Sequence, residues 1–347
     1  MSTTCLITSH NYAEFIGNAL DSALAQTVPF DEIIVVDDGS TDGSVEYLVN
    51  KYGQHRAVQI VSKSNQGQLS CFNEGFARAT GDIVFFLDAD DVYEPNYVEH
   101  ALEVYRRDPA FDFVYCGHRQ FGGRNKVQLA FRQDRDLGYS VVLAAYRREW
   151  IGAPTSCLSM RRRILEKILP LPFLQDWRTR ADDCLVFGAS LAGARKYFLA
   201  QPLVRYRVHD KNQFFGRPVD KFAAYRRRLA INALFEYLQR KLCYDAGRLG
   251  EFHHREFCTI ERPTFRQFGQ YIGLSGKSRA SILRRLACMA VMTAHYLRAM
   301  RLAKSNGNES TVSAESELAP SLRVIHPMDA TSSISVDRHS VGRRHAA

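Results

Sequence analysis

The first hundred residues alternate between short apolar runs and amphipathic segments, and this alternation limits the folds open to the chain. Apolar runs rich in β-formers stand at residues 5–9, 33–36, 58–62 and 83–87. Between them, residues 16–24 and 69–76 carry apolar side chains at the spacing of one helix face, and residues 41–49 open a further helix. Nearly continuous apolar strands separated by helices predict a parallel sheet with helices on both faces.

Polar residues follow three of these strands directly. The exits read TSHN at 8–11, DDGSTD at 37–42 and DADD at 88–91. In open parallel sheets, ligands bind in the crevice beyond the carboxyl ends of the strands. We therefore expect the three exits to converge on one crevice.

The exit DADD contains two carboxylates, Asp88 and Asp90, in a D-x-D arrangement. Extended backbone would direct both side chains to the same face, where they suit a hard cation such as Mg²⁺ or Mn²⁺. An EF-hand is excluded because Tyr93 stands where its loop needs glycine. The alternative for this motif is a solvated turn at the end of a strand.

The exit DDGSTD offers a second carboxylate pair. Asp37 or Asp38 can accept hydrogen bonds from a nucleobase or from ribose hydroxyls. Alternatively, the segment is a turn in which residues 40–42 cap the following helix. A third pair, Asp182 and Asp183, stands at the predicted start of a helix. This pair can supply a general base. Alternatively, it only reflects the preference of helix N-termini for acidic residues.

Later segments are less regular but still predict strands and helices. A strand is expected around 111–117 and another around 196–208. We divide the chain into a nucleotide-binding half (1–110), an acceptor-binding and catalytic half of the same domain (111–216), a basic helical extension (217–303) and a disordered tail (304–347).

Charge is unevenly distributed, although the net charge is +9. Residues 1–100 hold 4 Lys and Arg against 15 Asp and Glu, and the excess of basic residues lies entirely in the remainder. The basic extension is expected to pack on the catalytic domain as a solvated helix; the alternative is contact with an anionic membrane surface through 279–304. It lacks a nucleic-acid-binding motif, so we expect no nucleic-acid partner.

Neither a signal peptide nor an apolar run long enough to span a membrane is visible in the sequence. The eight cysteines are scattered, without a C-x-x-C pair, which argues against a zinc site or a disulfide framework. We therefore expect a cytoplasmic protein, with the inner face of the membrane as the place of any peripheral contact.

Taken together, TSHN, VVDDGSTD, NQGQLSCFNEGFARATG and FFLDADD resemble the nucleotide-binding half of the family 2 glycosyltransferases. The resemblance continues through APTSCLSMRR, RADDCLVFG and LVRYRVHDKN, to about residue 215. It implies a GT-A fold, which is Rossmann-like, with a mixed, mainly parallel sheet flanked by helices.

The resemblance also implies roles for particular residues on the nucleotide side of the site. Thr8 and His10 match positions that border the uracil ring, and Asp38 matches the carboxylate that binds the base. Gly67 belongs to the matching loop near the nucleotide. The residues expected to bind the nucleotide are Thr8, His10, Asp38, Asn65, Gln68 and Asp88.

On the reaction side, the resemblance implies Asp183 as the general base, with Asp182 beside it. Asp90 matches the metal ligand, and His209 matches a histidine that completes the metal or diphosphate site; its alternative is a structural role. Trp177 can stack on an acceptor sugar or pack in the core. Thr155 and Ser156 are further candidates to line the sugar-binding pocket.

The expected activity is therefore a metal-dependent, inverting transfer of a sugar from a nucleotide-sugar, UDP-linked, to a hydroxyl of a glycan or lipid-linked glycan. The expected cofactor is Mg²⁺ or Mn²⁺. Two alternatives remain: a non-catalytic protein that binds nucleotide-sugars, and a nucleotidyltransferase, which would release pyrophosphate.

Overall fold

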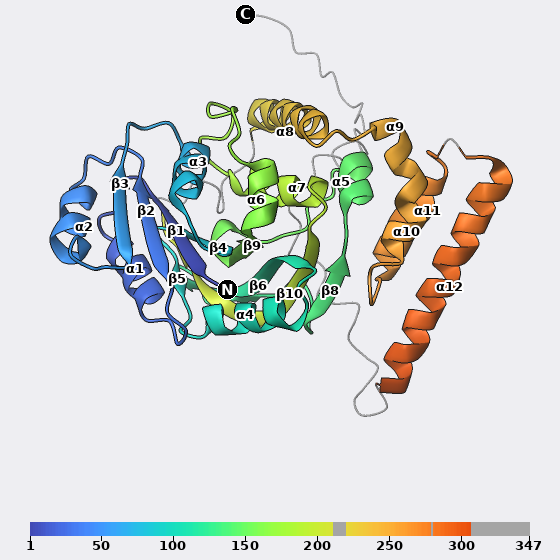
Figure 1. Ribbon diagram of the computed structural model, residues 1–347, viewed down its shortest axis with the longest axis horizontal. Coiled ribbons are helices and arrows are strands. Elements are labelled where there is room, and N and C mark those ends of the chain that lie inside the picture. Colours follow the sequence, from blue (N-terminus) through green and yellow to red (C-terminus); the bar gives the residue numbers. More distant parts are fainter. Residues whose placement is uncertain (211–219, 279, 307–347) are drawn as a thin grey trace, which may run out of the picture. The chain divides into compact units, whose positions relative to one another are not determined.

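In the part of the chain that the computed structural model describes, residues 1–210, 220–278 and 280–306, ten strands form one mixed sheet (Figure 1). The strands are β1 (Thr3–Ser9), β2 (Glu32–Asp37), β3 (Val58–Ser62), β4 (Ile83–Asp88), β5 (Val92–Tyr93), β6 (Phe111–Gly122), β7 (Val127–Gln128), β8 (Arg135–Gly138), β9 (Leu158–Arg161) and β10 (Arg195–Val208). Their order across the sheet is β3-β2-β1-β4-β9-β6-β10-β5, with β7 beside β6 and β8 beside β10.

Strands β1 to β4 pair in parallel, as the alternation predicts, and β6 pairs in parallel with β10. The antiparallel strand β9 joins these two parallel groups, because it lies between β4 and β6. The sheet is thus mixed and mainly parallel, which confirms the predicted fold class.

Helices cover both faces of the sheet (Figure 1). The described α-helices are α1 (Ile16–Leu24), α2 (Ser44–Tyr52), α3 (Gln68–Arg78), α4 (Tyr97–Arg107), α5 (Val141–Arg147), α6 (Arg162–Ile168), α7 (Asp182–Leu191), α8 (Lys221–Lys241), α9 (Ala246–Leu249), α10 (His253–Phe257), α11 (Phe265–Ser275) and α12 (Ile282–Asn306). In Figure 1, α3, α6 and α7 lie above the sheet, and α1 and α4 lie below it.

The central strands are buried on both faces, which explains why their sequences are apolar throughout. The side chains of Ile33 to Val36 in β2 and of Val84 to Leu87 in β4 are 0–1% exposed. Burial of this kind stabilises the fold by about 25 cal/mol for each Å² of apolar surface removed from water. The same strands end at the polar exits, so the core fixes the position of the candidate site.

The elements that the sequence did not predict lie where its pattern is weakest. Between 120 and 150 the structure has the short strands β7 and β8 and the helix α5. The two-residue strand β5 follows Asp91 at once, and it pairs with β10 through Tyr93 and Val204. Strands this short are held by their partner strand, and they leave almost no periodicity in the sequence.

The basic extension is helical, as predicted, and it packs on the rest of the described chain at two places. Helix α8 packs against α7. Farther along, a small second core of Val142, Leu143, Phe257, Ile260, Tyr271, Leu274 and Met292 joins α5 to α10, α11 and α12. Between α5 and α10, Glu256 accepts hydrogen bonds from the backbone N–H groups of Val142 (2.8 Å) and Leu143 (3.1 Å).

Helix α12 continues to Asn306, beyond the predicted boundary at 303. From residue 307 onward the predicted tail lies outside the described residues, as does Arg279 of the basic segment. None of the described helices combines the length and the apolar composition needed to cross a bilayer.

Candidate active site

The ends of β1, β2 and β4 lie level with one another, so their polar exits share one edge of the sheet. Thr8 pairs with Val36 of β2 on one side and with Asp88 of β4 on the other. Ser9 pairs with Asp37. The predicted convergence of these exits is therefore present in the structure.

Asp88 is held by two side chains from other elements. Its Oδ1 accepts hydrogen bonds from Thr8 Oγ1 (3.2 Å) and from Gln68 Nε2 (2.9 Å). The amide oxygen of Gln68 in turn accepts from the backbone N–H of Ala181 (2.9 Å), directly before α7. Gln68 thus connects the D-x-D motif to the helix that carries the acidic pair.

Asp90 meets His209, as the metal-site hypothesis requires. The Nε2 atom of His209 lies 3.0 Å from Oδ2 of Asp90, and the side chains are 13% and 12% exposed. The His209 ring also packs against Phe15, with ring centroids 4.9 Å apart, and against Tyr12 at 6.1 Å. These aromatic contacts fix the imidazole beside the D-x-D motif.

Asp91 is a structural member of the same turn. It is 1% exposed, and it accepts from Ser156 Oγ (2.6 Å) and from the backbone N–H of Arg207 (2.9 Å). The guanidinium of Arg207 donates to the carbonyl of Asp90 at 2.8 Å. The sequence pattern did not single out Arg207, since this role depends on β10 lying beside the turn.

Burial and mutual repulsion disfavour the charged forms of these carboxylates. Burial, followed by the charges of Asp90 and Asp182, raises the pKa of Asp88 to about 7. Burial, followed by the charges of Asp90 and Asp88, raises the pKa of Asp91 well above its usual value. A concentration of carboxylates that repel one another is an environment into which a cation fits.

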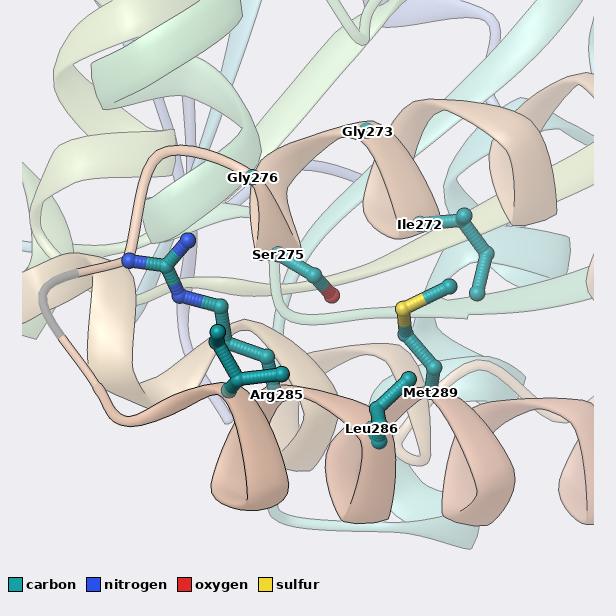
Figure 2. Close-up of a pocket in the computed structure, with 8 residues that line it drawn as sticks. Ile272, Gly273, Ser275, Gly276, Arg285, Leu286 and Met289 are labelled. Carbon is teal, nitrogen blue, oxygen red and sulfur yellow. The ribbon is translucent and has the colours of Figure 1, made fainter.

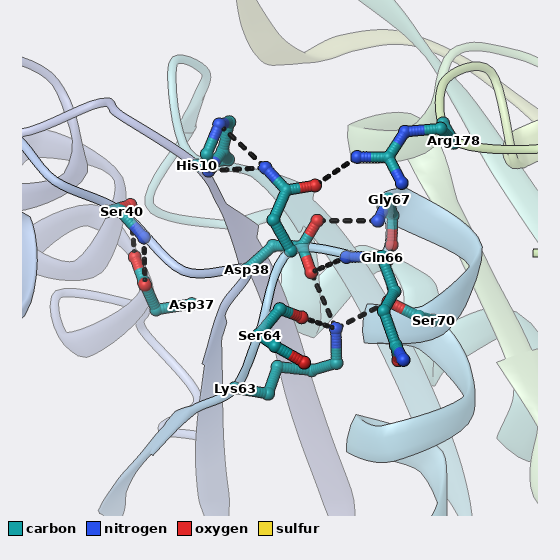
Figure 3. A network of polar contacts seen from close by, with 11 residues as sticks. His10, Asp37, Asp38, Ser40, Lys63, Ser64, Gln66, Gly67, Ser70 and Arg178 are labelled. Atoms are coloured by element: carbon teal, nitrogen blue, oxygen red, sulfur yellow. Dashed lines mark hydrogen bonds and ion pairs between the residues drawn. The ribbon is translucent and has the colours of Figure 1, made fainter. Parts of the chain in front are cut away.

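Asp38 lies under the loop that follows β3 (Figure 3). Its Oδ1 accepts from Lys63 Nζ (2.6 Å) and from the Gln66 N–H (2.9 Å), and its Oδ2 accepts from the Gly67 N–H (2.7 Å). These hydrogen bonds lower its pKa against the opposing effect of burial. The carboxylate is 4% exposed, so it organises the loop before any contact with a base.

His10 contacts Asn65, which belongs to this loop. The amide nitrogen of Asn65 lies 3.0 Å from Nε2 of His10, and its oxygen accepts from Arg178 (Figure 3). Gly67 has φ +93°, and a Cβ there would lie 2.3 Å from the Cα of Arg178. Only glycine fits this close approach. Arg178 is therefore a member of the site that the sequence analysis missed.

The acidic pair occupies the first turn of α7, as predicted. Asp183 is 1% exposed, and burial and the charge of Asp182 raise its pKa to about 7. Arg227 of α8 forms an ion pair with Asp183. Burial also raises the pKa of Asp182. The pair therefore lies in a setting that makes a carboxylate a stronger proton acceptor than it is in water.

The three sugar-side candidates are less open than expected. Trp177 is 2% exposed, which agrees with its alternative role in core packing; the ring is not open to an acceptor sugar in this conformation. Ser156 is fully buried and donates to Asp91, so it lies beneath the D-x-D turn rather than on a pocket wall. Thr155 is 4% exposed and lies 3.5 Å from Gln68 Nε2.

Two other features lie away from these residues. A groove of about 370 Å³ between α11 and α12 is lined by Ile272, Gly273, Ser275, Gly276, Ile282, Arg285, Leu286 and Met289 (Figure 2). His253, His254 and Cys288 form a cluster, but both ring nitrogens of His253 already have partners, the Gly250 carbonyl (2.7 Å) and Oγ of the groove-lining Ser275 (2.8 Å). Neither feature joins the candidate active site.

Comparison with known proteins identifies the domain that carries this site. Residues 4–169 match the model of glycosyl transferase family 2. They belong to this family. An uncharacterised glycosyltransferase of Nostoc sp. is 34% identical over 215 residues, which cover 61% of this chain and 66% of that relative. The chondroitin synthase of Pasteurella multocida is 38% identical over 113 residues, 33% of this chain but 12% of the synthase.

Solved structures agree with the glycosyltransferase assignment at the level of the fold. TarS residues 1–349 of S. aureus, in complex with UDP-GlcNAc, has a TM-score of 0.55 and 18% identity, and the match covers 88% of this chain and 92% of that one. The domain therefore has the GT-A fold. Asp182, Asp183 and His209 lie beyond the matched residues 4–169, so part of the candidate site comes from outside the family match.

Proposed function

We propose that this protein transfers a sugar from a UDP-sugar to a hydroxyl of a glycan or lipid-linked glycan, with inversion at the anomeric carbon. In this proposal, Asp183 is the general base, and Asp90 and His209 hold a divalent cation, Mg²⁺ or Mn²⁺. The observation that carries it is the convergence of the D-x-D motif, His209 and the acidic pair at one edge of the sheet.

The residues at this edge fit a divalent cation. Asp90 and His209 present an oxygen and a nitrogen ligand 3.0 Å apart, and the carboxylates of Asp88 and Asp91 add negative charge around them. Carboxylate oxygens suit Mg²⁺ and Mn²⁺. When bound there, the cation would neutralise charge on the leaving diphosphate.

The chain's own residues would handle the nucleotide and the proton. Thr8, His10 and Asn65 would border the base, and Gln68 would orient Asp88 toward the ribose. The acceptor oxygen would form a bond to the anomeric carbon as the bond from that carbon to the diphosphate oxygen breaks. Asp183 would accept the hydroxyl proton during this attack, since its burial makes the carboxylate basic.

The relatives support the choice of donor and acceptor. TarS was crystallised with UDP-GlcNAc, which supports a UDP-sugar as the first donor to test. Relatives in Pasteurella multocida are named for the synthesis of two glycans, chondroitin and hyaluronan, which supports a glycan acceptor.

A peripheral contact with an anionic membrane surface is part of the proposal, and it rests on α12. Ile282 and Leu283 at its start are 74% and 80% exposed, and Leu286 is 56% exposed. Arg284 stands among them, exposed as well. Exposed apolar side chains beside arginines suit a bilayer interface with anionic headgroups.

The test is UDP release from a panel of UDP-sugars in the presence of Mn²⁺, with glycan acceptors, compared with the same reaction in EDTA. Asp183→Asn should abolish transfer, whereas Asp21→Asn, which alters an exposed ion pair with Lys51 and a hydrogen bond from the Tyr52 hydroxyl (2.8 Å), should leave transfer unchanged. The product's anomeric configuration, read by NMR, should be opposite to that of the donor.

Each alternative predicts a different result. Tight UDP-sugar binding without turnover on any acceptor would indicate a non-catalytic binding protein. Release of pyrophosphate instead of UDP would indicate a nucleotidyltransferase. Full activity of Asp183→Asn would remove the base assignment while leaving the family intact.

A further inference from the structure

Arg227 brings a positive charge to the acidic pair from a part of the chain that lies well beyond the family match. It stands in the second turn of α8, and it forms an ion pair with Oδ2 of Asp183. The Asp183 side chain is 2% exposed and the Arg227 side chain 24% exposed, so the contact is shielded from solvent. The guanidinium also lies 6.0 Å from the ring centroid of Trp177.

We propose that Arg227 is a positioning residue for the catalytic base: it keeps the Asp183 carboxylate ionised and oriented until an acceptor hydroxyl arrives. The inference rests on the proposed role of Asp183. It makes α8 a part of the active site rather than a helix that only packs on the catalytic domain.

The charges around Asp183 show why such a residue is needed. On α7 itself, Asp182 lies beside it and disfavours its ionisation, as burial does. Arg227 from α8 and Arg180 from the turn before α7 act in the opposite direction. The neighbouring Cys184 is buried, which raises the pKa of its thiol and keeps it neutral. Without Arg227, the balance would favour a protonated Asp183, which cannot accept a proton from the acceptor.

The contact also limits where the acceptor can approach. Arg227 occupies the Oδ2 side of Asp183. Its ion pair can hold the carboxylate in one rotamer, since paired charges in a buried setting are strongly oriented. The other oxygen, Oδ1, is then the atom that would accept the acceptor proton.

The experiment measures kcat/KM against pH, from 5.5 to 9.5, for the unmodified protein, Arg227→Gln and Arg227→Lys. UDP-sugar, Mn²⁺ and a glycan acceptor found by the panel above are the substrates. Arg226→Gln, at an exposed position next to it on α8, is the matched control for loss of one positive charge. Thermal unfolding of each variant at both ends of the pH range separates unfolding from loss of chemistry.

We expect Arg227→Gln to shift the acidic limb of the pH profile to higher pH by about one unit or more. At pH values on the acidic side of this limb, kcat/KM should then be about tenfold lower than in the unmodified protein. Activity should recover at pH 9.5, because the base then ionises without its partner. Arg227→Lys keeps the positive charge, so its pH profile should lie close to that of the unmodified protein. Arg226→Gln should leave the profile unchanged.

Three outcomes would overturn the inference. A uniform loss at every pH would mean that Arg227 has a merely structural role. A higher KM for the UDP-sugar with an unmoved profile would mean that it binds the donor. A gain in activity at every pH would mean that the ion pair inhibits the base. Asp183→Asn, assayed alongside, keeps the questions apart: if it stays active, the base assignment in the proposed function fails, whatever the Arg227 variants do.

Discussion

His209 and Asp90 stand 119 residues apart in the chain, yet Nε2 of the imidazole lies 3.0 Å from Oδ2 of the carboxylate. The approach is possible because β10 ends beside the D-x-D turn, where the backbone N–H of Arg207 binds Asp91. His209 follows β10 directly, and its ring is held against Phe15. This fixed geometry is the basis for proposing the imidazole and the carboxylate as a pair of ligands for one ion.

The first prediction concerns this pair. His209→Ala should weaken Mn²⁺ binding in the presence of UDP, measured by isothermal titration calorimetry. The loss should be at least the roughly tenfold effect that follows removal of an outer partner of a metal site. The fold should persist, because the surrounding core is untouched.

His55→Ala is the control, since His55 is exposed and lies before β3, far from the D-x-D motif in the sequence. Equal Mn²⁺ affinity in His209→Ala and the unmodified protein would show that His209 is structural, which is the alternative that its position in the sequence left open.

The second prediction links the base to stability. Burial and Asp182 raise the pKa of Asp183 from 3.8 to about 7, so the folded state holds this proton more tightly than the unfolded chain. The corresponding stabilisation is present below about pH 4 and is lost as the pH rises through about 7. Asp183→Asn removes this titration, so the variant should unfold at a higher temperature than the unmodified protein at pH 8, and the gap should shrink toward pH 4.

Thermal unfolding at the two pH values, followed by circular dichroism, measures this difference. A higher unfolding temperature of Asp183→Asn at pH 8 would mean that the variant loses activity but gains stability, as is common for substitutions of catalytic residues. An Asp183→Asn protein that is less stable at pH 8 would mean that the ion pair with Arg227 outweighs the desolvation of the carboxylate.

The third prediction concerns the attachment of the C-terminal helices. Glu256 is 7% exposed, and it accepts from the N–H groups of Val142 and Leu143 and from the hydroxyl of Tyr271 (2.7 Å). Glu256→Ala should lower the free energy of unfolding by about 2 kcal/mol or more, because buried donors left without an acceptor cost about 1–3 kcal/mol each. Urea unfolding measures this loss.

Tyr271→Phe should cost less, about 1 kcal/mol, since it removes a single hydrogen bond. Glu251→Ala is the control, because the Glu251 side chain is 38% exposed and is paired only at 3.8 Å with Arg284. A Glu256→Ala protein as stable as the control would show that the apolar contacts of the second core hold these helices without it.

The fourth prediction tests the membrane contact. The protein should float with vesicles that contain phosphatidylglycerol, and less with vesicles of phosphatidylcholine alone. Added salt should weaken binding, because headgroup attraction is screened over about 10 Å at 0.1 M. The double change Ile282→Ser and Leu283→Ser should reduce flotation, whereas Val49→Ser, at a 51% exposed position of the acidic half, should not. Equal flotation with vesicles of phosphatidylcholine alone and with vesicles that contain phosphatidylglycerol would contradict the proposal.

Much of the fold follows from the sequence because it depends on local patterns. The runs at 5–9, 33–36, 58–62 and 83–87 became β1 to β4 with boundaries shifted by no more than two residues. Level strand ends are a consequence of parallel pairing, so the meeting of Thr8 with Asp88 could be expected before the structure was known. The short strands β7 and β8 could not be predicted from the sequence, since they depend on pairing with the neighbouring strands β6 and β10.

The candidate site divides in the same way. The sequence by itself determined which carboxylates end the strands, Asp38, Asp88 and Asp90, and that an acidic pair opens a later helix. Only the tertiary structure decided how they are supported: Gln68 between Asp88 and α7, Ser156 beneath Asp91, and Arg227 on Asp183. The physical reason is that a strand end is set by hydrogen bonds to its neighbours, whereas the partner of a buried charge is set by how distant helices pack.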